Sequence, residues 1–120
     1  MANRIAYEER KAIYEMAIGL FGSEHQINKF DEELGEFLAE FARIRNNEGD
    51  IECFAEEMAD LLIMLEQLRL IFGVNEKVGR YMDMKVMRLQ RRMSAATGSP
   101  VKVSDLYDED GGEIVGEGHG

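Results

Sequence analysis

The chain has 120 residues, 45% of them apolar, which limits it to one domain with one modest core. Acidic residues outnumber basic residues 24 to 14, for a formal net charge of -10, which argues against general binding of nucleic-acid polymers or anionic membranes. The single cysteine cannot form an internal disulfide, and no apolar run resembles a signal peptide or a membrane span. We therefore expect a small cytoplasmic protein.

Helices dominate the predicted secondary structure, since the chain has one proline and no alternating β pattern of useful length before residue 100. Four helices are predicted, over approximately residues 4–20, 24–45, 51–72 and 76–96. Their predicted N-caps are Asn3, Ser23, Asp50 and Asn75. Ser23 also has the spacing of a capping box to Gln26. The predicted helix stops are Gly22, Gly73, and Gly98 with Pro100.

Apolar residues in the second and third predicted helices recur at steps of three and four. These residues are Ile27, Phe30, Leu34, Phe37, Leu38 and Phe41, and then Ile51, Phe54, Met58, Leu61, Leu62, Leu65 and Leu68. A single apolar stripe of this kind is typical of helices packed in a bundle. We therefore predict an all-α, four-helix bundle-like domain over residues 1–97.

The remaining residues, 98–120, form an acidic, glycine-rich C-terminal tail. Two short apolar segments, 101–103 and 114–115, offer a weak hairpin as one interpretation. A flexible tail is the preferred prediction, because so little apolar surface cannot offset the entropy of ordering the segment.

Charge is distributed unevenly along the predicted helices. Residues 24–66 hold 13 acids and three bases, whereas residues 77–92 hold six bases and one acid. This order divides the chain into an acidic middle, a basic fourth helix and an acidic tail, which the net charge alone conceals.

An internal similarity at an offset of 24 residues connects the two acidic helices, because residues 30–41 resemble residues 54–65. It matches Glu33 with Glu57 and Glu36 with Asp60. Each pair lies on one flank of an apolar stripe, and a short turn makes the helices antiparallel neighbours. Packing would bring the four carboxylates together, raise their pKa values and favour a hard divalent cation such as Mg²⁺.

Competing interpretations of these acids remain. A single pair of glutamates one turn apart is common on exposed helices and carries little weight alone. Glu32 and Glu56 point further toward solvent, where solubilising acids are the simpler interpretation. A di-iron carboxylate site requires Glu-x-x-His on two helices, and neither His25 nor His119 follows a glutamate by three residues.

Two motifs in these helices resemble a known family. Glu32-Glu33-Leu34-Gly35-Glu36, followed by Glu57-Met58-Ala59-Asp60, resembles the EExxE…ExxD signature of MazG-type nucleoside triphosphate pyrophosphohydrolases. Residues 56–68 look especially like the small, single-domain, phage-type and bacterial members. The resemblance covers about residues 20–95, and the spacing of the motifs agrees with the family pattern.

The resemblance implies an all-α fold that forms a homodimer or homotetramer. It implies Mg²⁺ as cofactor, held by Glu33, Glu36, Glu57 and Asp60. It also implies hydrolysis of a nucleoside triphosphate, by our expectation a deoxynucleotide or a non-canonical nucleotide, to the monophosphate and pyrophosphate. Glu32 or Glu56 would orient or deprotonate the attacking water.

Expected substrate contacts lie on the second and fourth helices. Four residues share one stripe of the fourth helix and would bind the triphosphate: Tyr81, Lys85, Arg88 and Arg92. The alternative is a solvated basic face that pairs with the acidic helices. Gln26 and Lys29 share a face with the expected metal ligands, where a base or phosphate would lie, although Gln26 equally fits a capping role. The chain has no tryptophan, so Phe or Tyr would stack on the base.

Two other functions stay open at this stage. One is a non-catalytic helical interaction module with a degenerate nucleotide site, although the four intact carboxylates argue against it. The other is a related phosphohydrolase that cleaves a different phosphate linkage.

Overall fold

The computed structural model describes residues 4–106. It contains four α-helices, α1 (Tyr7–Phe21), α2 (Ser23–Arg45), α3 (Ile51–Ile71) and α4 (Asn75–Thr97), and the short 3-10 helix η1 (Val103–Leu106). No strand occurs in this part of the chain, which confirms the predicted all-α class. The chain divides into two compact units, one up to residue 76 and one from residue 77, and each is described by itself.

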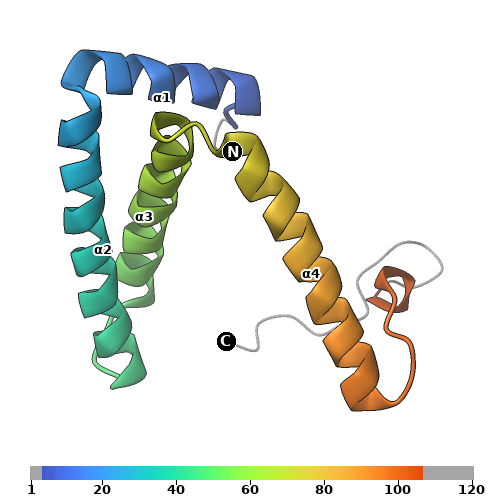
Figure 1. The fold of residues 1–120 in the computed structure, drawn as a ribbon. Helices are drawn as coiled ribbons and strands as arrows, with labels where there is room; N and C mark the ends of the chain where they lie inside the picture. The colour runs from blue at the N-terminus through green and yellow to red at the C-terminus, as the bar shows by residue number, and fades with distance from the viewer. Residues whose placement is uncertain (1–3, 107–120) are drawn as a thin grey trace. The chain divides into compact units, whose positions relative to one another are not determined.

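The first unit is built around the pair α2 and α3. These helices pack along their lengths in antiparallel directions, and α1 packs against both, lying across the end where α2 begins and α3 ends (Figure 1). Gly22 alone connects α1 to α2, with a φ of 92° that a residue with a Cβ rarely adopts. The turn between α2 and α3 includes Asn47 at φ 59°. This arrangement brings the two acidic helices side by side, as the sequence predicts.

Three phenylalanines stack at the turn end of the α2–α3 pair. The ring centroids of Phe37 and Phe54 lie 5.6 Å apart, and the Phe41 ring lies 6.0 Å from Phe37 and 6.2 Å from Phe54. Offset aromatic pairs at this separation stabilise a fold beyond the area they bury. The cluster thus fixes one end of the helix pair.

Polar side chains occupy the most buried positions along the same pair. Among the described residues only Tyr14 and Met64 are buried apolar side chains, whereas Gln26, Glu33 and Gln67 are buried polar ones. Burying a polar or charged group costs free energy unless a partner compensates it. The most buried positions of this unit are therefore shared between polar and apolar side chains.

The start of α1 differs from the prediction. The helix begins at Tyr7, three residues later than expected, and its N-cap residue Ala6 has an extended backbone and no side-chain cap. The predicted cap Asn3 lies outside the described residues. The Tyr7 hydroxyl accepts a hydrogen bond from Asn75 Nδ2 at 2.9 Å, so a contact that the local sequence does not reveal holds this end of the helix.

Two further predicted N-caps are wrong. Because Gly22 takes the N-cap position without a side-chain cap, α2 begins at Ser23 itself and the capping box with Gln26 is not formed. Similarly, Asn75 is the first residue of α4 rather than the residue before it, and its side chain is engaged with Tyr7.

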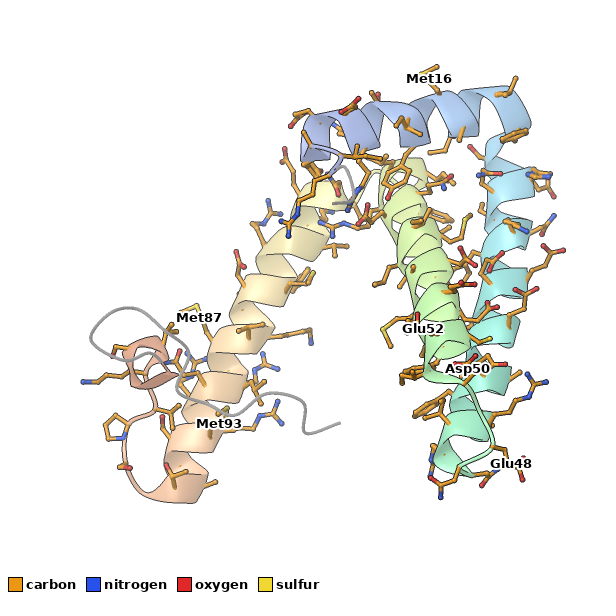
Figure 2. The ribbon with its side chains drawn as sticks, turned by 180° about the vertical axis from the view of Figure 1, so that it is seen from behind. Met16, Glu48, Asp50, Glu52, Met87 and Met93 are labelled. Atoms are coloured by element: carbon orange, nitrogen blue, oxygen red, sulfur yellow. The ribbon has the colours of Figure 1, made fainter. Side chains whose placement is uncertain are left out.

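The N-cap of α3 and the helix stops are confirmed. Asp50 accepts a hydrogen bond from the backbone N–H of Glu52 at 2.9 Å and lies at the turn that leads into α3 (Figure 2). Gly73 and Gly98 follow the ends of α3 and α4 in the left-handed region, at φ 64° and 76°.

In the second unit, the chain after α4 returns to the helix. The backbone N–H of Val101 donates to Ser94 Oγ at 2.9 Å, and Gln90 Nε2 donates to the Val101 carbonyl at 2.6 Å. Residues 101–106 form no strand, so the first half of the alternative hairpin is not present. Its second half, residues 114–115, lies outside the described residues, and the predicted boundary at residue 97 stays a prediction.

Helix α4 is amphipathic and carries an exposed row of apolar side chains. None of its residues is buried, and Met87 and Met93, labelled in Figure 2, are 55% and 45% exposed. The other large exposed apolar residues of α4 are Tyr81, Met82, Met84, Val86 and Leu89. Within residues 4–106, none of the helices combines the length and the apolar character that crossing a membrane requires.

Candidate metal centre

Three carboxylates meet where α2 packs on α3. Glu33 and Glu36 come from adjacent turns of α2 and Glu57 comes from α3, and each places one carboxylate oxygen within 4.8 Å of the others. The offset of 24 residues explains the meeting, because it puts equivalent acidic flanks on two antiparallel neighbours. We call Glu33, Glu36 and Glu57 the carboxylate triad.

Two oxygens of the carboxylate triad are buried without a partner. Oε2 of Glu33 and Oε2 of Glu57 accept no hydrogen bond from any described residue, and Glu33 as a whole is only 7% exposed. An unpartnered buried carboxylate oxygen is costly, because it loses its hydration and gains nothing in return. A cation bound between the three side chains would restore the missing interaction.

The electrostatics of the carboxylate triad are those of crowded acids. Desolvation by burial raises the pKa of Glu57 above its usual range, and the Glu36 carboxylate raises it further through its charge and a side-chain hydrogen bond. The charges of Asp60 and Glu33 act in the same direction. The neighbouring acids therefore disfavour ionisation of Glu57, and a positive charge at the carboxylate triad would relieve this effect.

Asp60, the fourth predicted ligand, lies at the edge of this group. Its side chain is exposed. It is not among the carboxylates whose oxygens lie within 4.8 Å of one another. Its charge still contributes to the raised pKa of Glu57. The structure thus brings three of the four predicted ligands together and leaves Asp60 beside them.

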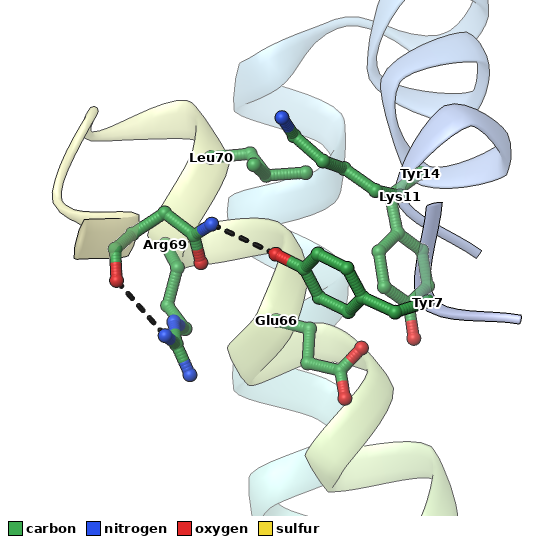
Figure 3. A pocket seen from close by; sticks show the side chains of 7 residues that line it. Tyr7, Lys11, Tyr14, Glu66, Arg69 and Leu70 are labelled. Carbon is green, nitrogen blue, oxygen red and sulfur yellow. Dashed lines mark hydrogen bonds between the residues drawn. The ribbon is translucent and has the colours of Figure 1, made fainter. Parts of the chain in front are cut away.

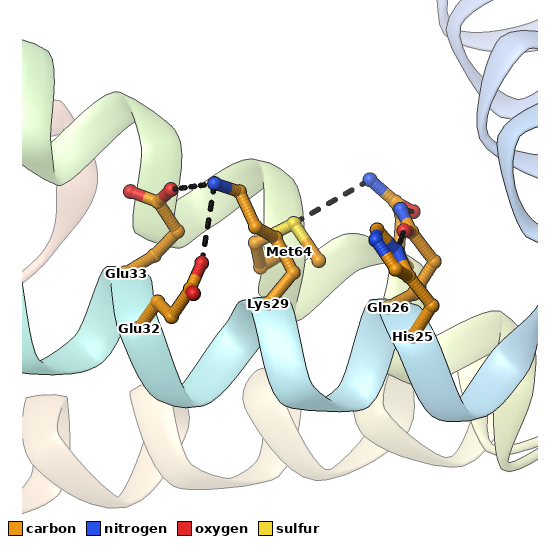
Figure 4. Close-up of polar contacts among 7 residues, drawn as sticks. His25, Gln26, Lys29, Glu32, Glu33 and Met64 are labelled. Carbon is orange, nitrogen blue, oxygen red and sulfur yellow. Dashed lines mark hydrogen bonds and ion pairs between the residues drawn. The ribbon is translucent and has the colours of Figure 1, made fainter. Parts of the chain in front are cut away.

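Lys29 is a basic residue that forms an ion pair with the carboxylate triad. Its Nζ lies 3.2 Å from Glu33 Oε1 and 3.3 Å from Glu32 Oε2 (Figure 4). Hydrogen bonding to Glu33, and then to Glu32, raises the pKa of Lys29 above its usual value. Lys29 therefore stays charged and spans a buried and an exposed carboxylate.

The two predicted water-activating acids, Glu32 and Glu56, are both exposed. Glu32 is held beside the carboxylate triad by its ion pair with Lys29. Glu56 acts on a different neighbour, since its charge helps to raise the pKa of Cys53, for which Asp50 is the largest cause. Of the two acids, Glu32 shares Lys29 with Glu33 of the carboxylate triad.

A chain of buried amides continues the same face of α2 and α3. Gln26 Nε2 donates to Gln67 Oε1 at 2.7 Å, and Gln67 Nε2 contacts Met64 Sδ at 3.7 Å. His25 Nδ1 lies 2.8 Å from Gln26 Oε1 on the other side (Figure 4). This network follows the carboxylates and Lys29 along the α2–α3 interface.

Sequence reasoning missed Gln67, although a signal for it exists. Glu57, Asp60, Met64 and Gln67 follow helical steps of three and four on α3. Gln67 is thus a polar residue on the same helical face as the acidic motif. It is 4% exposed, which marks it as the buried partner of Gln26.

The predicted substrate residues on α4 belong to the second unit. Tyr81 is 58% exposed and lines a recess of about 250 Å³ together with Lys77, Arg80 and Met84. Lys85, Arg88 and Arg92 are exposed along the same helix and do not line that recess. Their contact with a triphosphate at the carboxylate triad stays a prediction.

Two cavities of the first unit lie where α1 covers α3, and neither is lined by the carboxylate triad. A mostly apolar groove of about 510 Å³ includes Tyr14, Leu62 and Gln67 in its lining. A smaller pocket of about 60 Å³ includes Tyr7 and Arg69 in its lining, and Arg69 Nη2 donates to the Asn75 carbonyl at 2.9 Å (Figure 3). Burial, and then a hydrogen bond with Glu66, raises the pKa of Tyr14 to about 12.

Comparisons with known proteins give no relative for this chain. No protein-family model, no curated protein and no solved structure matches it. The resemblance to MazG-type pyrophosphohydrolases therefore depends on the two motifs and their spacing.

Proposed function

We propose that the chain is a Mg²⁺-dependent nucleoside triphosphate pyrophosphohydrolase of the MazG type, acting on a deoxynucleotide or a non-canonical nucleotide. The observation that carries this proposal is the carboxylate triad with its two buried, unpartnered oxygens. A purely solubilising cluster of acids would be fully hydrated. The two motifs that resemble the MazG signature coincide with this cluster, which supports the same function.

The donor set suits a hard divalent cation. Glu33, Glu36 and Glu57 offer only carboxylate oxygens, which are the ligands that Mg²⁺ and Mn²⁺ prefer. Exposed Asp60 would complete the set from the solvent side, where phosphate oxygens also approach. When bound, Mg²⁺ would neutralise charge on the phosphates and lower the pKa of a water molecule.

The reaction assigned to this site is attack of water on the α-phosphorus. The new bond joins the water oxygen to that phosphorus, the bond from the α-phosphorus to the bridging oxygen breaks, and pyrophosphate leaves with the bonding electrons. Glu32 would accept the proton of the water, with Glu56 as the alternative. Since Glu32 is exposed beside the carboxylate triad, it is the better-placed acid.

Substrate contacts would come from two helices. Lys85, Arg88 and Arg92 of α4 would neutralise the triphosphate, and Tyr81 would stack on the base, since the chain has no tryptophan. On α2, Gln26 and Lys29 lie along the same face as Glu33 (Figure 4). Lys29 offers its charge to a phosphate, and Gln26 offers an amide that its bond to Gln67 holds in place.

The proposal includes a homodimer or homotetramer in the cytoplasm. One row of α3 is exposed, formed by Ile51 at 63%, Met58 at 38%, Leu62 at 53% and Leu65 at 40%. An apolar row on a helix is normally covered by another element. Another chain of the same kind would cover this row.

The second candidate is a non-catalytic helical interaction module, which the same exposed apolar rows favour. A degenerate site would be expected to lose one or more of its carboxylates. All four predicted ligands are intact in this sequence, and this favours the enzyme.

A turnover assay separates these functions. The purified chain is incubated with a panel of ribo- and deoxynucleoside triphosphates and Mg²⁺, and the products are separated by chromatography. Monophosphate with pyrophosphate is the expected result. Diphosphate with orthophosphate would instead indicate hydrolysis of a different linkage, and no turnover by folded protein would contradict the enzyme.

Variants connect this activity to the site. Glu36→Gln and Asp60→Asn each remove one anionic oxygen donor, so each should lower kcat/KM on the order of 100-fold while leaving the helical circular-dichroism spectrum unchanged. Glu9→Gln, an equivalent change on α1 outside the carboxylate triad, serves as the control. Full activity in both site variants would show that neither side chain is a metal ligand.

A further inference from the structure

Lys29 occupies a specific place between two unlike carboxylates. Its Nζ is 3.2 Å from Oε1 of Glu33 and 3.3 Å from Oε2 of Glu32. The Glu33 side chain is 9% exposed, whereas that of Glu32 is 66% exposed. The ammonium group therefore has one buried partner inside the carboxylate triad and one solvated partner outside it (Figure 4).

A divalent cation at the carboxylate triad would share Glu33 with this ammonium group. Glu33 has one oxygen paired with Lys29 and one oxygen buried without a partner. Two cations on one carboxylate repel each other, and the repulsion between a divalent ion and an ammonium is twice that between two single charges at the same distance. Occupation of the metal site would therefore weaken the bond between Lys29 and Glu33.

The structure provides an alternative position for the displaced charge. Glu32 already lies within ion-pair distance of Lys29 Nζ. If the ion pair with Glu33 breaks, the ammonium group therefore still has a carboxylate partner. The helical spacing of three residues to Glu32 and four to Glu33 makes both pairs available from one lysine position.

From this geometry we propose that Lys29 is a tethered counter-ion of the carboxylate triad, which pairs with both Glu33 and Glu32 in the metal-free protein and keeps only its pairing with Glu32 when the metal binds. This inference rests on the proposed metal site and adds its regulation. Lys29 lowers the affinity of the free site for a divalent cation. Once released, its charge is available to a phosphate of the substrate.

Calorimetric titration of the full chain with Mn²⁺, in the absence of nucleotide, tests this role. Lys29→Met removes the competing charge, so its Kd for Mn²⁺ should fall at least about threefold, within the range that an exposed ion pair is worth. Lys29→Arg keeps the charge and should bind Mn²⁺ as the original chain does. Lys11→Met is the control, because Lys11 pairs with Glu15 on α1 at 3.8 Å.

The role of Glu32 gives a second readout. If Glu32 keeps the lysine that Glu33 releases, Glu32→Gln should weaken Mn²⁺ binding in the original chain and have a smaller effect in the Lys29→Met background. Equal effects in both backgrounds would show that Glu32 acts only through its own charge, and would overturn this pairing.

Other outcomes separate this inference from the proposed function. Saturable Mn²⁺ binding with the same Kd in the original chain and in Lys29→Met would overturn the counter-ion role and leave the metal centre intact. Absence of saturable binding in the original chain, in Lys29→Met and in Lys29→Gln would overturn the metal centre and this inference together.

Discussion

At the scale of single residues, Glu57 links the site to the stability of the fold. Its pKa is raised above the usual 4.5, first by desolvation and then by Glu36. A raised pKa means that the fold favours the protonated carboxyl. This contribution to stability is complete below pH 4.5 and disappears as the pH rises through the higher folded value.

The metal-free protein should therefore lose stability from Glu57 as the pH rises above 4.5. Glu57→Gln removes this titration, so in EDTA the variant should melt at a higher temperature than the original chain at pH 7. The melting temperature of the variant should also decrease less between about pH 4 and pH 7 than that of the original chain. Thermal melts followed by circular dichroism measure both effects, with Glu9→Gln as the control. A variant that melts lower at pH 7 would contradict this account of the site.

The sequence predicted individual acids well where a repeated pattern specified them. Glu33, Glu36 and Glu57 could be found because an internal similarity places equivalent flanks on neighbouring helices. Gln67 was harder to predict as a site residue, because its hydrogen bond comes from Gln26, which is 41 residues earlier in the chain. Only the packed structure shows which polar residue acquires a buried partner.

At the scale of helices, α3 depends on a local cap. Asp50 accepts a hydrogen bond from the backbone N–H of Glu52. Such a cap contributes about 1 kcal/mol to the free energy of unfolding. Asp50→Ala should therefore lower the free energy of unfolding by about 1 kcal/mol in urea titrations. Asp50→Asn keeps an oxygen that accepts the hydrogen bond, so it should lower the free energy of unfolding by only a small part of this amount. Equal losses in the two variants would show that the cap does not stabilise α3.

Helix ends show where local sequence rules succeed and fail. Asp50 was predictable because its cap involves only the residues that follow it. The local sequence wrongly indicated Ser23 as the N-cap of α2, because Gly22, the one residue between α1 and α2, takes that position. It was also wrong for Asn75, because the Asn75 side chain bonds to Tyr7, 68 residues earlier in the chain. Tertiary contacts override capping preferences at these two sites.

At the scale of the whole molecule, exposed apolar rows predict association. Leu62 in the exposed row of α3 is 53% exposed, and covering this row would require another chain. Light scattering coupled to size-exclusion chromatography should give a mass of at least twice 13.7 kDa. Leu62→Glu should shift the population toward the monomer, because it places a charge in the covered row. A monomeric original chain at micromolar concentration would contradict the oligomer.

The all-α class and the order of the helices followed from periodicity and composition, because the second and third helices carry an apolar stripe and glycines follow the first, third and fourth helices. The apolar row of α3 that remains uncovered was harder to foresee. Its residues belong to the same three- and four-residue pattern as those facing α2, and only packing separates the two sides. The same limit applies to Lys29, because only the packed structure shows that its two carboxylate partners, Glu32 and Glu33, differ in exposure.

The central claim is that carboxylates of α2 and α3 support water attack on the α-phosphorus of a nucleoside triphosphate. Its most direct test is turnover in ¹⁸O-labelled water with Mg²⁺, followed by mass spectrometry of both products. The account predicts the label in the nucleoside monophosphate and none in pyrophosphate, with turnover lost in Glu57→Gln. Label in the pyrophosphate, or undiminished turnover by Glu57→Gln, would contradict it.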